Sequence, residues 1–522
     1  MSRALSAGQI TRKPAVHSKD GVVVSQNRIA SEIGAEILRD GGNAVDAAVA
    51  ISFALGVVEP WMSGIGGGGY MIVRHANETS AQVIDFGMCS PAGLQVADYP
   101  IVGGVQKDLF FWPAVKDDAN VFGARSVAIP GVVAGMGLAH EMFGTRPLTA
   151  LLAPAIAEAR AGLSVDWYCQ LVLASAAPHL AQYPGSRAAF LDAAGFPKSS
   201  GWVAVEQTRC NLTRLADTLE ILAREGTDDF YRGDLADRMV RELNEEGGRH
   251  SHDDFAFYKA RIVPASEFTY RDHRVFGTPE LTAGPTLERV LDILMNWQPK
   301  SQGPDAAAYI AYDQAIRAAN TERMQTMGDI AHEPVPGCTS HFNVIDRDGT
   351  LVAVTQTLLS MFGSRLMLPT TGVLMNNGIM WFDPALGKPN SIAPGKRCLS
   401  NMMPTLLEHR HGRRFALGGA GGRKIMPAMV QLVSFLLDFD MGLESAMHTP
   451  RIDCSMADVT VVDETMNEEM QAALQAALPS VISAPRTVYP FNFACPAIAE
   501  YSAEGNAAVA ETMAPWAEAV AE

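Results

Sequence analysis

The stretch GCTSHFN at residues 337–343 decides the fold, because it places a threonine at the mouth of a β-hairpin. A loop with two prolines, PVPG, ends at its first residue, and such breakers terminate regular structure. The residues 341–345 then predict a strand, the Asp-Gly pair in 346–349 predicts a tight turn, and LVAVT at 351–355 predicts the returning strand. We therefore expect Thr339 to begin the first strand of a hairpin.

Thr339 is a candidate nucleophile on chemical grounds. Most threonines at strand starts only satisfy turn hydrogen bonds, so the position alone does not identify a nucleophile. The hydroxyl becomes a good nucleophile when its own α-amine can accept the proton, which requires a cut directly before it. A free α-amine has a pKa of about 7.7–8.0, close enough to neutral for a general base. The same hydroxyl can attack the carbonyl of Cys338, so one residue, Thr339, would serve both maturation and turnover.

The rest of the chain alternates strands with helices around this hairpin. Residues 44–55 are apolar nearly all round and predict a buried helix that Asn43 can cap. Residues 414–417 predict another strand, and residues 427–438 predict a helix that follows it. Strand pairs followed by helices indicate an α+β or layered α/β/β/α domain. The tail after Asn506 is rich in Ala and Glu, and we expect a short helix or a frayed end.

Two motifs with other meanings are disfavoured. GIGGGG at 64–69 matches the dinucleotide fingerprint, but a helix precedes it and a strand follows, the reverse of what nucleotide binding needs. A glycine-rich turn that lets backbones approach closely is the better interpretation. His409 and His411 stand among charged residues, so we interpret them as a solvated surface turn rather than a metal site. We therefore predict no metal and no cofactor.

The composition limits partners and location. The 522 residues are 48% hydrophobic and 19% charged, enough for a large core. The net charge of −16 argues against nucleic acid or an anionic membrane as partner. The polar N-terminal stretch does not resemble a signal peptide, and seven cysteines without CxxC spacing indicate reduced thiols. We expect a cytoplasmic protein.

Many short motifs occur in the order typical of one family, and the chain resembles the gamma-glutamyltransferases from about residue 20 to residue 500. The matching motifs are GGNAVDAA (41–48), GIGGG (64–68), SVAIPG (126–131), TSH (339–341), FGS (362–364), NN (376–377), PN (389–390), PGKR (394–397), MPT (403–405), GG (421–422) and PR (450–451).

The resemblance implies a fold and a processing step. The fold would be the four-layer αββα N-terminal-nucleophile hydrolase fold of the α+β class. The chain would be made as a zymogen and cut autocatalytically between Cys338 and Thr339. The large subunit would comprise residues 1–338 and the small subunit residues 339–522, and the two would stay together.

The resemblance also implies catalytic roles. Thr339 matches the nucleophile, and Thr357, in the pattern TQT, matches the second threonine that orients it. Gly421 and Gly422 match the backbone amides of the oxyanion hole, although a plain tight turn is the ordinary reading of such a segment. Losing one oxyanion donor costs roughly 3–4 kcal/mol of barrier.

The chain departs from the family where the substrate's glutamyl head is held. The family grips the α-carboxylate with an Arg in a DFRE segment and with two serines, and it grips the α-amine with polar and acidic side chains. The corresponding positions here are Gly87, the half-kept pair Ser400 and Asn401, and the residues Leu359, Gly378 and Trp381.

These replacements predict a different acyl group. A zwitterion without its partners would be buried and unpaired, at a cost of several kcal/mol. Met380, Trp381 and Phe382 can line an apolar substrate pocket or can simply be core. Arg365 and Arg423 are candidates to hold a substrate carboxylate in another orientation, and surface salt bridging is the alternative for both.

We therefore predict a self-processing amide hydrolase or acyltransferase that acts on a small-molecule amide through an acyl-threonine ester, without a standard γ-glutamyl substrate. The alternative is γ-glutamyl activity on glutathione or related amides with a rearranged pocket. A third hypothesis is a scaffold protein that processes but does not turn over. The predicted partners are the amide substrate and the two subunits, with a homo-oligomer of heterodimers as a possibility.

Overall fold

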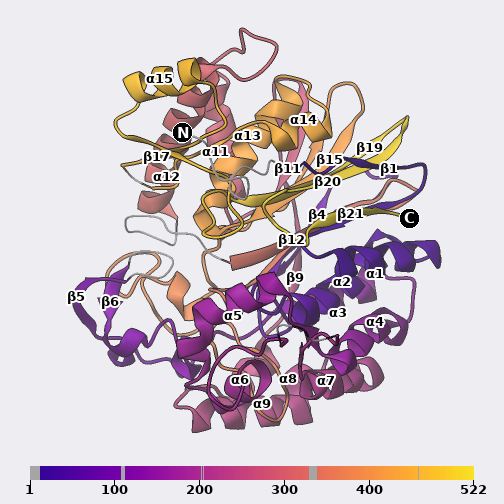
Figure 1. Cartoon of the computed structure of the whole chain (residues 1–522), viewed down its shortest axis with the longest axis vertical. Coiled ribbons are helices and arrows are strands. Elements are labelled where there is room, and N and C mark those ends of the chain that lie inside the picture. The colour runs from indigo at the N-terminus through magenta and orange to yellow at the C-terminus, as the bar shows by residue number, and fades with distance from the viewer. Residues whose placement is uncertain (1–11, 107–111, 202, 204, 328–337, 457) are drawn as a thin grey trace.

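The computed structural model describes residues 12–106, 112–201, 203, 205–327, 338–456 and 458–522. The proline loop expected at 334–337 lies outside these residues. Two seven-stranded sheets dominate the structure (Figure 1). Sheet I has the order β1 (Val16–Ser18), β20 (Gly505–Ala510), β19 (Cys495–Ser502), β15 (Arg414–Ala420), β14 (Thr405–Glu408), β11 (His273–Gly277) and β10 (Ser266–Tyr270). Sheet II has the order β21 (Glu518–Ala521), β2 (Val22–Ser25), β12 (Cys338–Ile345), β13 (Leu351–Leu359), β3 (Gly68–Arg74), β4 (Gln82–Phe86) and β9 (Arg261–Pro264).

Helices cover the outer face of each sheet (Figure 1). Those over sheet II are α1 (Arg28–Arg39), α2 (Ala44–Val58), α3 (Val132–Phe143), α4 (Leu148–Ala161), α5 (Trp167–Leu180), α6 (Pro184–Phe190), α7 (Thr213–Glu225), α8 (Asp229–Arg232), α9 (Asp234–Glu245) and α10 (His252–Phe257). Those over sheet I are α11 (Gly284–Leu294), α12 (Ala306–Thr326), α13 (Ile425–Leu437), α14 (Leu443–His448) and α15 (Glu468–Ala477). Smaller pairings join β16 (Ile452–Asp453), β17 (Thr460–Asp463) and β18 (Val481–Ala484), β5 (Ile101–Val105) with β6 (Pro113–Val115), and β7 (Leu163–Ser164) with β8 (Arg209–Cys210).

Three separate apolar clusters fill the spaces between the four layers. One packs the α2 side of sheet II, another packs α11 to α13 against sheet I, and the third lies between the two sheets. Each sheet buries both faces, one on helices and one on the other sheet. The four-layer αββα arrangement is therefore confirmed.

The expected hairpin is β12 and β13, whose ladder closes at Ile345 and Leu351. Side chains of a strand alternate between faces. Phe342 and Val344 belong to the helix-side cluster, whereas Ile345 belongs to the cluster between the sheets. By the same alternation Thr339 faces the space between the sheets.

Helix α2 and the loop after it are as the sequence predicts. Every residue of α2 is buried, and Asn43 and Asp46 form a capping box at its start. In the glycine-rich loop, a Cβ on Gly67 would lie 2.2 Å from the carbonyl oxygen of Thr357. The glycines therefore allow two backbones to touch, which confirms the structural interpretation of this motif.

The expectation for the tail is wrong. Residues after Asn506 form strands, because β20 pairs with β1 and β19, and β21 pairs with β2 at the edge of sheet II. Alanine is a good helix former, but here the pairing with existing sheets overrides that local preference.

Within the described part of the chain, no helix is both long enough and apolar enough to cross a membrane.

Candidate active site

Thr339 lies at an irregular point of the hairpin. The ladder pairs Cys338 with Leu359 and then Ser340 with Gln356, so β13 carries one residue more than β12 at this point. Such a bulge re-aims side chains and is common beside active sites. The side chain of Thr339 is buried, and nothing is described of the side chain of Cys338. The strand runs through both residues.

Thr357 faces the same side of sheet II as Thr339. Its hydroxyl oxygen accepts a hydrogen bond from the backbone N–H of Leu359 at 2.7 Å. Leu359 has a φ of 85°, so this bond holds a strained turn at the end of β13. The hydroxyl of Thr357 is thus fixed within the bulge that lies opposite Thr339.

The way the two sheets stack places Gly421 and Gly422 at the same level as Thr339. At one end, Asn506 donates to the carbonyl oxygen of Asp346 at 3.4 Å, and cross-strand pairing puts Asn506 in line with the start of β15. Farther along, a Cβ on Gly418 would lie 2.3 Å from the imidazole of His341. Strands β12 and β15 therefore pass each other in opposite directions, and Thr339 lies level with the end of β15, where Gly421 follows.

Gly421 and Gly422 link β15 to α13 through a short 3-10 turn, Gly422–Lys424. Their φ values are 133° and 58°, in the region that favours glycine. Among the described residues, neither amide N–H has a turn, loop or side-chain acceptor. Two amides at a helix N-terminus are suited to a developing negative charge.

His341 lies against Gly418 of sheet I, and its ring nitrogens are hydrogen-bonded within sheet II. Its Nδ1 lies 2.9 Å from the hydroxyl of Thr355, and its Nε2 lies 3.0 Å from Oδ1 of Asn343. Asn343 in turn donates to the carbonyl oxygen of Ala497 in sheet I. Burial lowers the pKa of His341 to about 3, so the ring is neutral at physiological pH.

The sequence interpretation missed a buried carboxyl group beside Ser340, the residue after Thr339. Glu59 forms the C-cap of α2, and its Oε2 accepts a hydrogen bond from Ser340 at 3.0 Å. Burial raises the pKa of Glu59 to about 8 and outweighs the hydrogen bond from Ser340, which lowers it. Cys495 lies near it and, with its own pKa raised by burial, is an uncharged thiol. An acidic residue directly after a mostly apolar, fully buried helix was the available signal.

The raised pKa predicts a pH-dependent stability. The folded carboxyl keeps its proton up to about pH 8, whereas the unfolded one releases it near 4.5. The free energy of unfolding should therefore fall as pH rises from about 4.5 to 8 and then level off. Glu59→Gln removes the ionisable group and with it this fall in stability. Made in a Thr339→Ala chain, which cannot undergo the predicted self-cleavage, it should raise the free energy of unfolding above pH 8 by on the order of 1–3 kcal/mol relative to Thr339→Ala alone. Urea unfolding at pH 4.5, 6, 7 and 8.5 measures the difference, and equal curves at all four would contradict the assignment.

The position of the family's carboxylate-binding arginine is closed. A Cβ on Gly87 would lie 2.7 Å from the hydroxyl oxygen of Tyr70, so no longer side chain fits in this direction. Tyr258 donates to the carbonyl oxygen of Gly87 at 2.8 Å, and Arg397 to the same atom at 3.2 Å. Arg397 also pairs with Asp85 at 3.3 Å. The guanidinium of Arg397 is thus held by Gly87 and Asp85 of the protein itself.

The positions matching the family's amine-binding residues lie in an apolar environment. Leu359 and Trp381 are buried in the cluster between the sheets. A Cβ on Gly378 would lie 2.8 Å from Cβ of Ala128, 3.0 Å from Oδ1 of Asn376 and 3.2 Å from the sulfur of Met88. The backbone pairing of Leu359 with Cys338 puts this region beside Thr339. The same cluster includes Tyr70, Met88, Trp112, Ile379, Met380, Phe382, Cys398 and Met402.

The serine pair is only half available. Ser400 is buried, and its hydroxyl oxygen accepts from the backbone N–H of Met402 at 3.0 Å. Its own carbonyl oxygen accepts from Arg323. Asn401 is partly exposed. The hydroxyl of Ser400 therefore stabilises its own turn, and a substrate-binding role for either residue stays a prediction.

The two candidate arginines differ in their surroundings. Arg365 is buried, lies 4.7 Å over the ring of Phe122, and donates to the carbonyl oxygen of Gly363. These contacts favour a structural role. Arg423 is partly exposed and directly follows the glycine pair, with its guanidinium 5.9 Å from the ring centroid of Trp112. Because Trp112 donates to the carbonyl oxygen of Met380, Arg423 lies beside the apolar cluster.

The expectation of a solvated turn is wrong for His409. This ring is buried and lies 4.4 Å from that of His273, although His411 is exposed. Nδ1 of His409 and of His273 each accept a backbone N–H, so the proton of each neutral ring sits on Nε2. The six described cysteines are free thiols, five of them buried, in accord with the prediction for that part of the chain.

Comparison with known proteins agrees with this geometry. A family model described as gamma-glutamyltranspeptidase matches residues 30–338 and 332–488. Acylase ACY 1 proenzyme of Pseudomonas sp. strain SE83 is 32% identical and covers 92% of this chain and 90% of its own length. The glutathione hydrolase proenzyme of Escherichia coli strain K12 is 30% identical, over 84% of this chain and 81% of its own. The crystal structure of cephalosporin acylase from Bacillus halodurans shares the fold, with a TM-score of 0.86 and 22% identity, over 100% of this chain and 99% of that one.

Proposed function

The chain belongs to the gamma-glutamyltranspeptidase family and has its N-terminal-nucleophile hydrolase fold, and from this premise we propose that it is a self-processing amide hydrolase with Thr339 as nucleophile. The scissile bond for processing is Cys338–Thr339, which gives subunits 1–338 and 339–522. Thr339 faces the space between the sheets and is level with two glycine amides, and this geometry supports the proposal.

The reaction follows from these groups. The hydroxyl oxygen of Thr339 attacks the amide carbon while the free α-amine accepts its proton. The amides of Gly421 and Gly422 donate to the oxygen that becomes negative. The intermediate collapses when the leaving amine takes the proton, and an ester on Thr339 remains. Water then attacks the ester by the same path and releases the acid, and an amine acceptor in place of water would give transfer.

We assign Thr357 the role of positioning the nucleophile. It lies within the bulge opposite Thr339, and its hydroxyl is fixed by the Leu359 amide. His341 contributes only indirectly, because it is neutral and orients Asn343, which donates to sheet I.

The acyl group is proposed to differ from γ-glutamyl. The observation that carries this proposal is the closed space at Gly87, where Tyr70 blocks the direction of the missing arginine. The apolar surroundings of Leu359 and Trp381 offer no charge to an ammonium group. An apolar acyl chain fits such a lining, and Arg423, beside Trp112, is the candidate for a carboxylate at its far end. The acylases among the relatives are consistent with this reading.

Three p-nitroanilides test the pocket by removing one group at a time. Glutaryl-p-nitroanilide lacks only the amine of the γ-glutamyl compound, and butyryl-p-nitroanilide also lacks the carboxylate. We expect kcat/KM for γ-glutamyl-p-nitroanilide to be about 10²-fold or more below that for the better of the other two, because a buried unpaired ammonium costs several kcal/mol. Preferred turnover of the γ-glutamyl compound at low concentration would favour the glutathione-type alternative instead.

The remaining assignments concern assembly and location. We propose that the two subunits remain associated, since β12 and β13 of the small one lie inside sheet II between β2 and β3 of the large one. A cytoplasmic location and an oligomer of heterodimers stay predictions.

A further inference from the structure

A cluster of five polar side chains lies on the helix side of the nucleophile strand. All are buried, and they come from α2 and its C-cap, from the glycine-rich loop, and from both strands of the hairpin. None of them has a role in the proposed chemistry. The members of this cluster, called the Glu59 cluster below, are Ser52, Glu59, Ser63, Ser340 and Gln356.

The hydrogen bonds of the Glu59 cluster form a directed chain. Ser52 donates to Oε1 of Gln356 at 2.5 Å, and Nε2 of Gln356 donates to the hydroxyl of Ser63 at 3.2 Å. Ser63 donates to the hydroxyl of Ser340, and Ser340 donates to Oε2 of Glu59, both at 3.0 Å. Glu59 is thus the last acceptor in this series of hydrogen bonds, and without its Oε2 the hydroxyl of Ser340 would lose its acceptor.

The chain of hydrogen bonds stabilises one pair of residues in the β12–β13 ladder. Ser340 and Gln356 are cross-strand partners, so Ser63 bridges the two side chains of a single rung of the ladder. The preceding rung joins Cys338 to Leu359. A cut before Thr339 separates Cys338 from the new N-terminal segment. Ser340 is then the first residue of that segment that pairs with β13. Chain ends without such ties fray.

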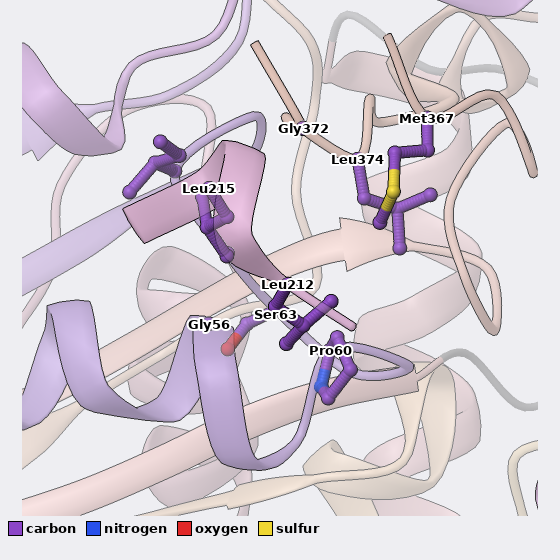
Figure 2. A pocket seen from close by; sticks show the side chains of 10 residues that line it. Gly56, Pro60, Ser63, Leu212, Leu215, Met367, Gly372 and Leu374 are labelled. Carbon is purple, nitrogen blue, oxygen red and sulfur yellow. The ribbon is translucent and has the colours of Figure 1, made fainter. Parts of the chain in front are cut away.

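The members of the Glu59 cluster are buried, and a small cavity lies beside one of them, Ser63. Figure 2 shows Ser63 beside Gly56 and Pro60 at a cavity of about 10 Å³, whose other labelled lining residues include Leu212, Leu215 and Leu374. This volume is at the lower limit for a single water molecule. Ser340 itself is fully buried, and its hydroxyl has Ser63 and Glu59 as partners.

We propose that Glu59 is a positioning residue, which acts through Ser340 to hold the freed N-terminus at Thr339 in the geometry of attack. The proposal rests on the proposed function, because it assigns a role only if Thr339 is the nucleophile. A displacement of about 1 Å at a reacting group can cost about 10²-fold in rate, so a tie one residue away matters for the chemical step.

The state of Glu59 suits this role. It lies at the C-terminal end of a buried helix, where the helix dipole disfavours an anion, and burial raises its pKa to about 8. The uncharged acid accepts a hydrogen bond without needing a cation. An amide oxygen can do the same, whereas a thioether is a poor acceptor.

This difference gives matched variants. Glu59→Met fills similar volume but removes the acceptor, and Glu59→Gln keeps an oxygen. Ser340→Ala deletes the donor to Glu59 together with the acceptor of Ser63. With the better of glutaryl- and butyryl-p-nitroanilide, we expect Glu59→Met and Ser340→Ala to lower kcat about 10- to 100-fold while KM changes less than about threefold. Glu59→Gln should retain most of the kcat. The same order should hold for the rate of self-processing, followed on denaturing gels.

The double variant Glu59→Met/Ser340→Ala completes the test. If both residues act through one hydrogen bond, the double variant should be no slower than the slower single variant. Wild-type kcat in Glu59→Met and Ser340→Ala, an equal loss in Glu59→Gln, or additive losses would each overturn the role of Glu59. Thr339→Ala, assayed alongside, reports separately on the proposed function, because turnover in that variant would contradict the nucleophile and not the cluster.

Discussion

Replacing Thr339 with alanine should leave one uncut chain and remove the activity. The hydroxyl forms the bond to the acyl carbon in both processing and turnover, so no other group in the proposed mechanism replaces it. We expect kcat to fall by about 10³-fold or more, with a single full-length band on a denaturing gel. The buried side chain loses a hydroxyl and a methyl group only, so the fold should persist.

Thr339→Ser is the matched control. It keeps the hydroxyl and loses only the methyl group, so it should process and turn over more slowly than wild type but clearly faster than Thr339→Ala. Circular dichroism of all three proteins checks that they are folded. Two bands from Thr339→Ala, or turnover comparable with wild type, would contradict the assignment of the nucleophile.

A second large effect is expected at Gly421. An alanine there would need a φ of 133°, and its Cβ would lie 3.1 Å from Cα of Ala494. The backbone must rotate to relieve both problems, which turns the amide away from the developing oxyanion. We expect Gly421→Ala to lower kcat about 10²- to 10³-fold, the loss typical of one missing oxyanion donor. Steady-state kinetics of the processed protein measure it.

Gly419→Ala provides the comparison two residues earlier in the same segment. Its φ is not in the left-handed region, and its nearest neighbour, Cα of Pro496, would lie 3.3 Å from the new Cβ. A small shift suffices, so this variant should keep most of its kcat. If Gly421→Ala and Gly419→Ala were equally active, the amide at Gly421 would have no part in the reaction.

The sequence predicted the elements that depend on local signals. The all-apolar stretch with Asn43 before it became the fully buried helix α2, and the Asp-Gly turn became the β12–β13 hairpin. Both signals act within a few residues of the chain. The predicted catalytic residues stay predictions, although Thr339, Thr357 and Gly421 lie in mutually consistent positions.

The errors and omissions involve contacts between distant segments. The tail reads as helix because its alanines have high helix propensity, yet β21 is fixed by pairing with β2 at the start of the chain. His409 reads as exposed because its neighbours are charged, but His273 from another strand covers it. Glu59 meets Ser340 only after folding brings together residues far apart in sequence.

The central claim is that residue 339 carries a free α-amine in the working protein. N-terminal sequencing and intact mass measurement of the purified, active protein test it directly. The account predicts two chains whose masses correspond to residues ending at Cys338 and beginning at Thr339. A fully active protein whose only chain still contains the Cys338–Thr339 bond would contradict it.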